Sequence, residues 1–195
     1  MKKIYITIIF LFLVLNPLYS QLQYKHDQSF IPDFVVSQFA GYIGFVSSGV
    51  GYNFYDESLK LELLYGYVPK SAGGISIHMF TCRGSYSLSH YRTFSGFLFS
   101  PLNFSFFVNY ARGNQYVLRW SPNYPKRYYR PTSIYTGESI GMSIKKSCEN
   151  SIIKGYEFYG DVVTMSEYLY EYCKNETVTL KDIISLAFGV RFYFL

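Results

Sequence analysis

The sequence predicts an all-β fold, specifically an eight-stranded antiparallel transmembrane up-and-down β-barrel. First, aromatic residues make up 21% of the 195 residues and charged residues only 16%, where about 25% charged is typical of soluble domains. Second, the end of the chain alternates between apolar and small or polar residues over about a dozen positions, the length of a tilted membrane-spanning strand. Third, no apolar run long enough for a membrane helix follows residue 20.

Length and composition narrow the class further. A chain of 195 residues fits one domain. The composition argues against a disordered chain, a coiled coil and a simple basic nucleic-acid binder, even though the formal net charge is +5. A mean hydropathy of +0.05 is too low for a helical membrane protein. Many aromatics with little charge instead suit a sheet that has one lipid-facing side.

The first 20 residues have the layout of a secretory signal peptide. Lys2 and Lys3 precede an apolar run over residues 4–15, and Pro17 and Ser20 follow it. A transmembrane anchor is the alternative, but the run is shorter than the ~20 residues that cross a bilayer. We therefore expect a signal peptide over residues 1–20, a periplasmic N-terminal arm over 21–36, and the barrel over 37–195.

The three cysteines are too few and too far apart for a disulfide framework. No Cys-x-x-Cys pair or other metal-ligand spacing accompanies them. No glycine-rich phosphate loop or dinucleotide fingerprint occurs either. We therefore expect neither a metal nor a cofactor, and the cysteines are interpreted as small free hydrophobes.

The last strand, residues 183–195, has the clearest facing. One face carries the large apolar residues, and the other carries small or polar residues, Arg191 among them. The apolar residues are Ile184, Leu186, Phe188, Val190, Phe192 and Phe194. Seven further strands are placed by the same period of two and by turn residues. Their predicted ranges are 37–54, 59–68, 75–87, 93–99, 103–111, 132–146 and 152–172.

Counting connections from a periplasmic start predicts which loops lie on which side. The long connection over residues 112–131 falls outside the cell. The turns at 69–74, 100–102 and 147–151 fall in the periplasm, in keeping with the short periplasmic turns of known barrels.

Six charged residues are phased toward the barrel interior. An eight-stranded barrel is just wide enough for side chains to fill it, and buried charges are normally paired. We therefore expect an interior ion-pair network. A proton or ion path is the less favoured alternative. The six residues are Lys60, Glu62, Arg83, Glu157, Asp161 and Arg191.

A catalytic alternative rests on His90, which lies beside Ser89 in a predicted outer loop. Such a pair could serve an outer-membrane lipid-modifying hydrolase or acyltransferase. However, no orienting carboxylate is evident, and the His-x-Ser motif of outer-membrane deacylases does not occur. An exposed loop histidine is the favoured interpretation.

The predicted outer loop is rich in cations and aromatics. These side chains could bind anionic sugars or phosphates, although a membrane-rim role against lipopolysaccharide is favoured. Nucleic acid is a poor candidate for a surface loop of a secreted protein. The residues concerned are Arg119, Trp120, Lys126, Arg127, Tyr128, Tyr129 and Arg130.

With these strands placed, the chain resembles small eight-stranded outer-membrane barrels, and is most similar to uncharacterised outer-membrane proteins of Bacteroidota. The segments that carry the resemblance are 38–44, 64–70, 124–129 and 182–194. The resemblance implies an outer-membrane location, outer-membrane lipid and lipopolysaccharide as partners, and recognition of the last strand by the barrel-assembly machinery.

Three hypotheses therefore stand. The first is a monomeric, non-catalytic barrel with an envelope structural or surface-interaction role. The second is the lipid-modifying enzyme, and the third is a soluble secreted β-sandwich binding module.

Overall fold

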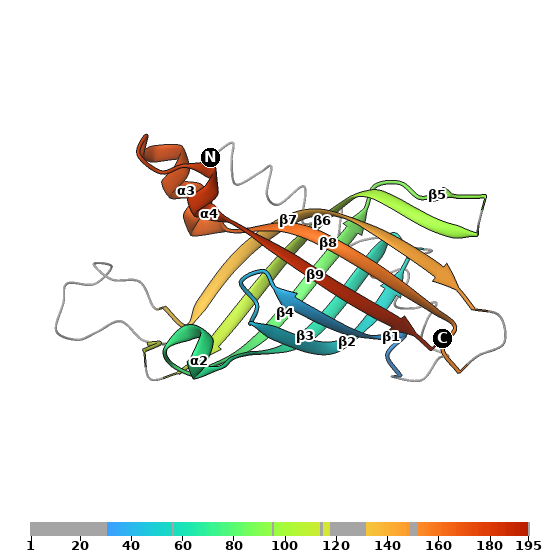
Figure 1. The fold of residues 1–195 in the computed structure, drawn as a ribbon, viewed down its shortest axis with the longest axis horizontal. Helices are drawn as coiled ribbons and strands as arrows, with labels where there is room; N and C mark the ends of the chain where they lie inside the picture. The colour runs from blue at the N-terminus through green and yellow to red at the C-terminus, as the bar shows by residue number, and fades with distance from the viewer. Residues whose placement is uncertain are drawn as a thin grey trace, which may run out of the picture. The chain divides into compact units, whose positions relative to one another are not determined.

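The computed structural model describes residues 31–55, 57–94, 96–113, 115–117, 132–148 and 152–194. Eight antiparallel strands close into a barrel, as Figure 1 shows, and this confirms the predicted fold class. Each strand pairs with its neighbours in the chain, and β1 closes the barrel by pairing with β9. The eight are β1 (Phe34–Ala40), β2 (Val46–Phe54), β3 (Leu59–Val68), β4 (Ile77–Ser87), β6 (Phe97–Arg112), β7 (Ile134–Ser147), β8 (Gly155–Met165) and β9 (Ile184–Tyr193).

Four short elements decorate the barrel. The two-residue strand β5 (Tyr91–Arg92) pairs with β6 in a projecting hairpin. Three helices belong to the connections: α2 (Lys70–Gly73), α3 (Ser166–Lys174) and α4 (Leu180–Ile183). We call the end with these helices the helical end and the opposite end, where β1 begins and β9 ends, the terminal end; they lie left and right in Figure 1.

Several predicted strand boundaries were wrong, and two of the errors cancel in the count of eight. The predicted strand 37–54 is two strands, because residues 40–45 turn back through left-handed backbone at Ala40, Gly41 and Tyr42. The predicted strands 93–99 and 103–111 are the single strand β6, and the expected turn at 100–102 is a register shift between Ser100 and Asn103. β1 also begins at Phe34, inside the predicted N-terminal arm.

The predicted strand 152–172 ends at Met165, where the chain continues as α3. Because the predicted strand 37–54 is two strands, the predicted side of the turn at residues 69–74 is wrong. Residues 69–74 lie at the helical end, the same end as the connection between β6 and β7, because two barrel strands, β4 and β6, separate the two connections. His90 lies at the terminal end instead of sharing an end with that connection.

The facing of the side chains follows the pleat around the whole barrel. In β9 the even-numbered residues from Ile184 to Phe192 point outward, and Ala187, Arg191 and Tyr193 are buried inside. β3 repeats the pattern, with Leu61 and Leu63 outside and Glu62 fully buried. On these two strands the outer face is apolar, and the inner face carries most of the polar residues. A cluster of buried apolar side chains, including Phe34, Val36 and Phe107, also lies inside the barrel.

Candidate functional site

The centre of the barrel interior is built around Glu62 of β3. Its carboxylate accepts a hydrogen bond from Nε of Arg83 on β4 and another from Nε of Arg191 on β9, the latter at 2.6 Å. All three side chains are at most 4% exposed. Strands that are far apart in the sequence thus meet at one carboxylate, and each charge that has left water has an opposite charge beside it.

The remaining predicted interior charges join the same network. Arg191 Nη1 donates to Glu157 Oε1 at 3.0 Å, and Lys60 Nζ lies 3.5 Å from that oxygen. Asp161 lies 4.0 Å from Arg83 Nη1. The structure therefore brings all six predicted interior residues together. Three cations face three carboxylates, which leaves this cluster without net charge.

Neutral partners that the sequence analysis did not identify complete the cluster. Tyr159 accepts a hydrogen bond from Arg83 Nη2 at 2.9 Å and donates to Gln38 Oε1 at 2.8 Å. The guanidinium of Arg191 stacks 4.0 Å from the centre of the Tyr159 ring. Tyr193 donates to Glu157. Inward facing was the available signal for these residues, but a hydroxyl or amide on a strand predicts no particular partner.

His90 lies where the terminal end meets the interior. Its Nδ1 is 2.7 Å from Ser100 Oγ and its Nε2 is 3.4 Å from Ser58 Oγ. Burial, with Lys60 adding to it, lowers the pKa of His90 below its ordinary value. The ring is therefore set between two hydroxyls, and within the described part of the chain no hydrogen bond joins it to Ser89.

This arrangement lacks the features of a hydrolytic dyad. Ser100, the serine nearest to the ring, is only 4% exposed, so a lipid ester has no open approach to it. No carboxylate among the described residues is hydrogen-bonded to His90, and an oriented base needs such a partner.

The turn between β1 and β2 folds into the barrel opening at the helical end. Ala40 N donates to Phe45 O at 3.1 Å, and Phe45 N donates to Tyr67 O on β3 at 3.0 Å. Ile43, at the tip, is 1% exposed. A Cβ on Gly66 would overlap the carbonyl oxygen of Ile43, so this glycine permits the close approach of the turn to β3.

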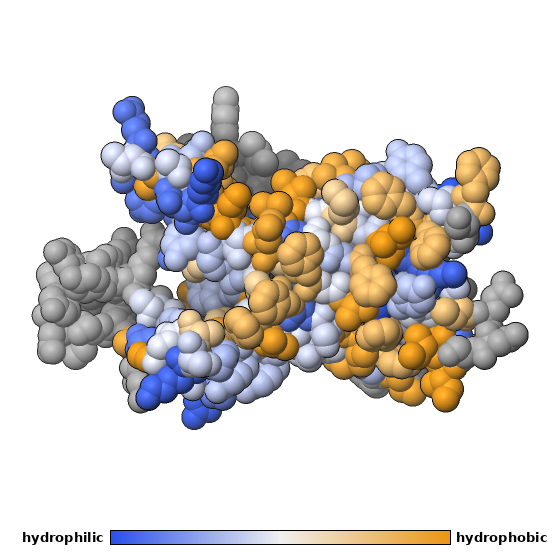
Figure 2. Space-filling view, viewed as in Figure 1, coloured by the Kyte–Doolittle hydropathy of each residue, from blue (hydrophilic) through white to orange (hydrophobic). Residues whose placement is uncertain are grey.

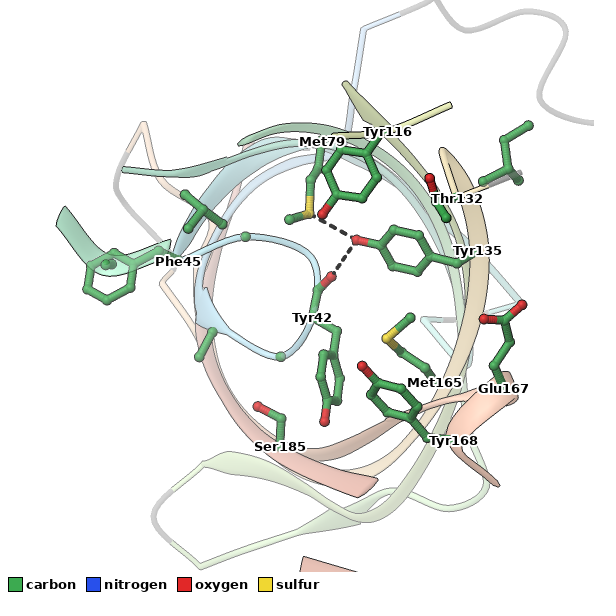
Figure 3. Close-up of a pocket in the computed structure, with 16 residues that line it drawn as sticks. Tyr42, Phe45, Met79, Tyr116, Thr132, Tyr135, Met165, Glu167, Tyr168 and Ser185 are labelled. Atoms are coloured by element: carbon green, nitrogen blue, oxygen red, sulfur yellow. Dashed lines mark hydrogen bonds between the residues drawn. The ribbon is translucent and has the colours of Figure 1, made fainter. Parts of the chain in front are cut away.

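Tyr42 holds the turn in place from inside. Its carbonyl oxygen lies 3.1 Å from both Asn109 Nδ2 and the Tyr135 hydroxyl, as Figure 3 shows for the latter. Tyr42 and Ala40 both have φ near 60°, at 63° and 62°. Left-handed backbone of this kind costs about 1–3 kcal/mol per non-glycine residue and persists only where the surroundings fix it.

Above this turn the helical end opens into a cup of about 570 Å³, a size typical of small-ligand sites. Its tyrosines point into the opening (Figure 3), and the Tyr42 and Tyr168 rings meet edge to face at 5.8 Å. Burial raises the pKa of Tyr42, and Tyr168 adds to the effect, so the Tyr42 hydroxyl stays a neutral donor. The aromatic and sulfur-bearing members of the lining are Tyr42, Phe45, Tyr116, Tyr135, Tyr168, Met79 and Met165.

The predicted binding residues of the long loop, Arg119 through Arg130, lie outside the described residues. Within the described ranges, no group of three or more His, Cys, Asp or Glu side chains is placed to hold a metal ion. The helices described are all too short or too polar to cross a membrane. In comparison with known protein families, curated proteins and solved structures, nothing matches this chain.

Proposed function

We propose that this protein is an integral β-barrel of the bacterial outer membrane, to which a signal peptide directs it. Its interior is sealed, and its role is a non-catalytic interaction at the cell surface. The observation that carries the proposal is that the outer surface of the barrel is apolar while charged side chains are buried inside it. Large apolar side chains cover the outer face, and the interior holds a network of buried charges and hydroxyls beside a cluster of buried apolar side chains.

The outer apolar face is continuous across the paired strands, and Figure 2 shows part of it as orange side chains over the barrel. Water-soluble monomers rarely expose apolar patches larger than a few hundred Å², whereas lipid requires this surface. Its members, each at least 37% exposed, include Val35, Phe39, Leu61, Leu63, Phe80, Phe104, Phe106, Val108, Ile140, Met142, Phe158, Val162, Leu186, Phe188 and Phe192.

The few charges on the outer face support the same proposal by where they lie. Among the described strand residues, Lys146 lies near the terminal end with its amine 4.9 Å from the Phe97 ring centre. Glu138 is level with the end of β8, and the Ser166 hydroxyl at the start of α3 donates to it at 2.7 Å. Charges near the ends of the strands suit headgroups and water, while the middle suits hydrocarbon.

Tyrosines lie toward the strand ends of the outer face on β3 and β4. On β3, Leu61 and Leu63 are followed by Tyr65 and Tyr67 toward the helical end. On β4, Tyr86 lies toward the terminal end. Tyrosine favours the interface between hydrocarbon and water because its ring is apolar and its hydroxyl is polar.

The interior and the cup support different parts of the proposed function. The charge network places paired side chains across the centre of the barrel, which favours a sealed scaffold over a solute channel. The cup at the helical end supplies a ligand-sized hollow with phenol hydroxyls and ring faces. This favours a surface-interaction role for that end.

Membrane fractionation of cells that express the full chain tests the proposal. We expect the protein to stay with the membrane pellet in high salt and to migrate faster on a gel when it is not boiled. Release by high salt, together with a single migration position, would contradict the proposal and favour a soluble module.

A further inference from the structure

One part of the outer face departs from the apolar pattern. His78, the second residue of β4, lies directly opposite Arg112, the last residue of β6, in the pairing register at the helical end. Both side chains are exposed on the outer face. No hydrogen bond or ion pair involves Arg112 within the described part of the chain.

Tyr65 is the hydrogen-bond partner of His78. Its hydroxyl lies 2.6 Å from His78 Nδ1, and the Tyr67 ring packs 5.2 Å from the imidazole. When the phenol donates to Nδ1, the neutral ring carries its proton on Nε2, which is then a donor. In that tautomer a guanidinium and an N–H donor lie side by side, the combination that binds a phosphate.

Two hollows extend along the outer face from this pair. The first holds about 630 Å³ and is bounded by Tyr65, His78, Phe80 and Arg112, among others. The second holds about 390 Å³, also borders Phe80, and lies over Cys82 and Val108. Cys82 and Val108 are directly paired, and both are small, so they leave a groove between larger neighbours. Those neighbours are Leu63, Phe80, Tyr110 and Ile134.

We infer that these two hollows form one binding site for a membrane lipid, with the headgroup phosphate at Arg112 and His78 and an acyl chain along the groove over Cys82. The inference rests on the proposed membrane location and deepens it. Arg112, which has no counter-ion among the described residues, is placed where the apolar face ends, and this matches the depth of lipid phosphates.

The apolar groove favours a lipid over a free phosphate ion. A water-exposed arginine alone holds an anion weakly, because water and salt screen it. A chain seated over Cys82 adds apolar contact that a soluble phosphate cannot make. The stacked rings of Phe80 and Tyr110, with centres 6.5 Å apart, form a fixed wall for that chain.

Native mass spectrometry of the full chain in detergent micelles, titrated with dioleoyl phosphatidylglycerol, tests the inference. We expect Arg112→Ala to weaken the bound-lipid equilibrium about tenfold, the effect of losing charge-assisted hydrogen bonds. Arg92→Ala removes an exposed arginine of β5, near the other end, and should leave binding unchanged. Cys82→Trp fills the groove and should also weaken binding.

Each result of this titration either supports the lipid site or contradicts it. Equal affinities for the Arg112→Ala and Arg92→Ala variants, or full competition by glycerol 3-phosphate, would overturn the lipid site. An unchanged affinity of Cys82→Trp would overturn the acyl-chain groove. Heat-modifiable migration of each variant separates these failures from failure of the proposed function, because a barrel that still folds and fractionates with the membrane leaves the membrane assignment intact.

Discussion

The buried charge network makes a quantitative prediction at Glu62. The substitution Glu62→Gln removes one negative charge from a site that is 0% exposed and leaves Arg83 and Arg191 facing a neutral amide. Each charge-assisted hydrogen bond contributes about 1.5–3 kcal/mol. Breaking a buried ion pair by removing one partner costs about 3–5 kcal/mol, since the other charge stays buried. We therefore expect a loss of about 3–5 kcal/mol in the free energy of unfolding.

Urea titration of the barrel in lipid vesicles, with the folded fraction measured by heat-modifiable gel migration, gives this number. Glu176→Gln is the matched control, because Glu176 is exposed in the connection between α3 and α4. A loss below about 1 kcal/mol, or one equal to that of the control, would refute a desolvated network whose charges depend on one another.

Three further predictions concern other parts of the barrel. Gly66→Ala should cost about 1–3 kcal/mol in the same urea titration because its Cβ meets Ile43, whereas Gly84→Ala, with open space beside it, should have little effect; equal effects would contradict the role of the inserted turn. Phe188→Arg should destabilise the barrel in vesicles by about 2–4 kcal/mol if the site is near the bilayer midplane, and a change under ~0.5 kcal/mol would indicate a water-facing position. His90 should titrate by NMR below 6.5; since the unfolded chain then takes up the proton first, this residue's contribution to stability is present above that pH and lost below it. His90→Gln should remove that part of the pH dependence, and a ring that titrates above 6.5 would refute the burial of its neutral form.

The sequence predicted the class of the fold and much of its facing. In β3 and β9, apolar and polar residues alternate without interruption, and one face can only be outside. The same phase placed Lys60, Glu62 and Arg191 inside. Alternation is a local property, so it needs no knowledge of neighbouring strands.

The misplaced boundaries have physical causes of their own. The turn at residues 40–45 uses left-handed backbone at Ala40 and Tyr42, and neither residue type predicts that conformation. Tertiary contacts with Tyr135 and Asn109 stabilise the turn. Pro101 suggested a turn but lies at an irregularity inside β6, a place where a strand tolerates proline. Long-range partners decided both cases.

The partners of His90 could not be predicted for a related reason. Its hydrogen-bonding hydroxyls belong to Ser58, in the turn between β2 and β3, and to Ser100 on β6, and not to the adjacent Ser89. The cup likewise gathers Tyr42, Tyr135 and Tyr168 from three separate connections or strands. Proximity in the chain was a poor guide, because Ser58 and His90 are 32 residues apart in the sequence and Tyr42 and Tyr135 are 93 residues apart.

Fluorescence quenching of single-cysteine variants tests the central claim that the outer face of this barrel meets hydrocarbon. Cys82 is exposed on the outer face of β4, and Cys173 is exposed on α3. With the other two cysteines changed to serine in each case, a fluorophore on each thiol is exposed to bromines on lipid acyl chains and to iodide in water. We predict that the bromines quench the label at Cys82 and that iodide quenches the label at Cys173. Quenching of the Cys82 label by iodide, with no effect of the brominated chains, would contradict the claim.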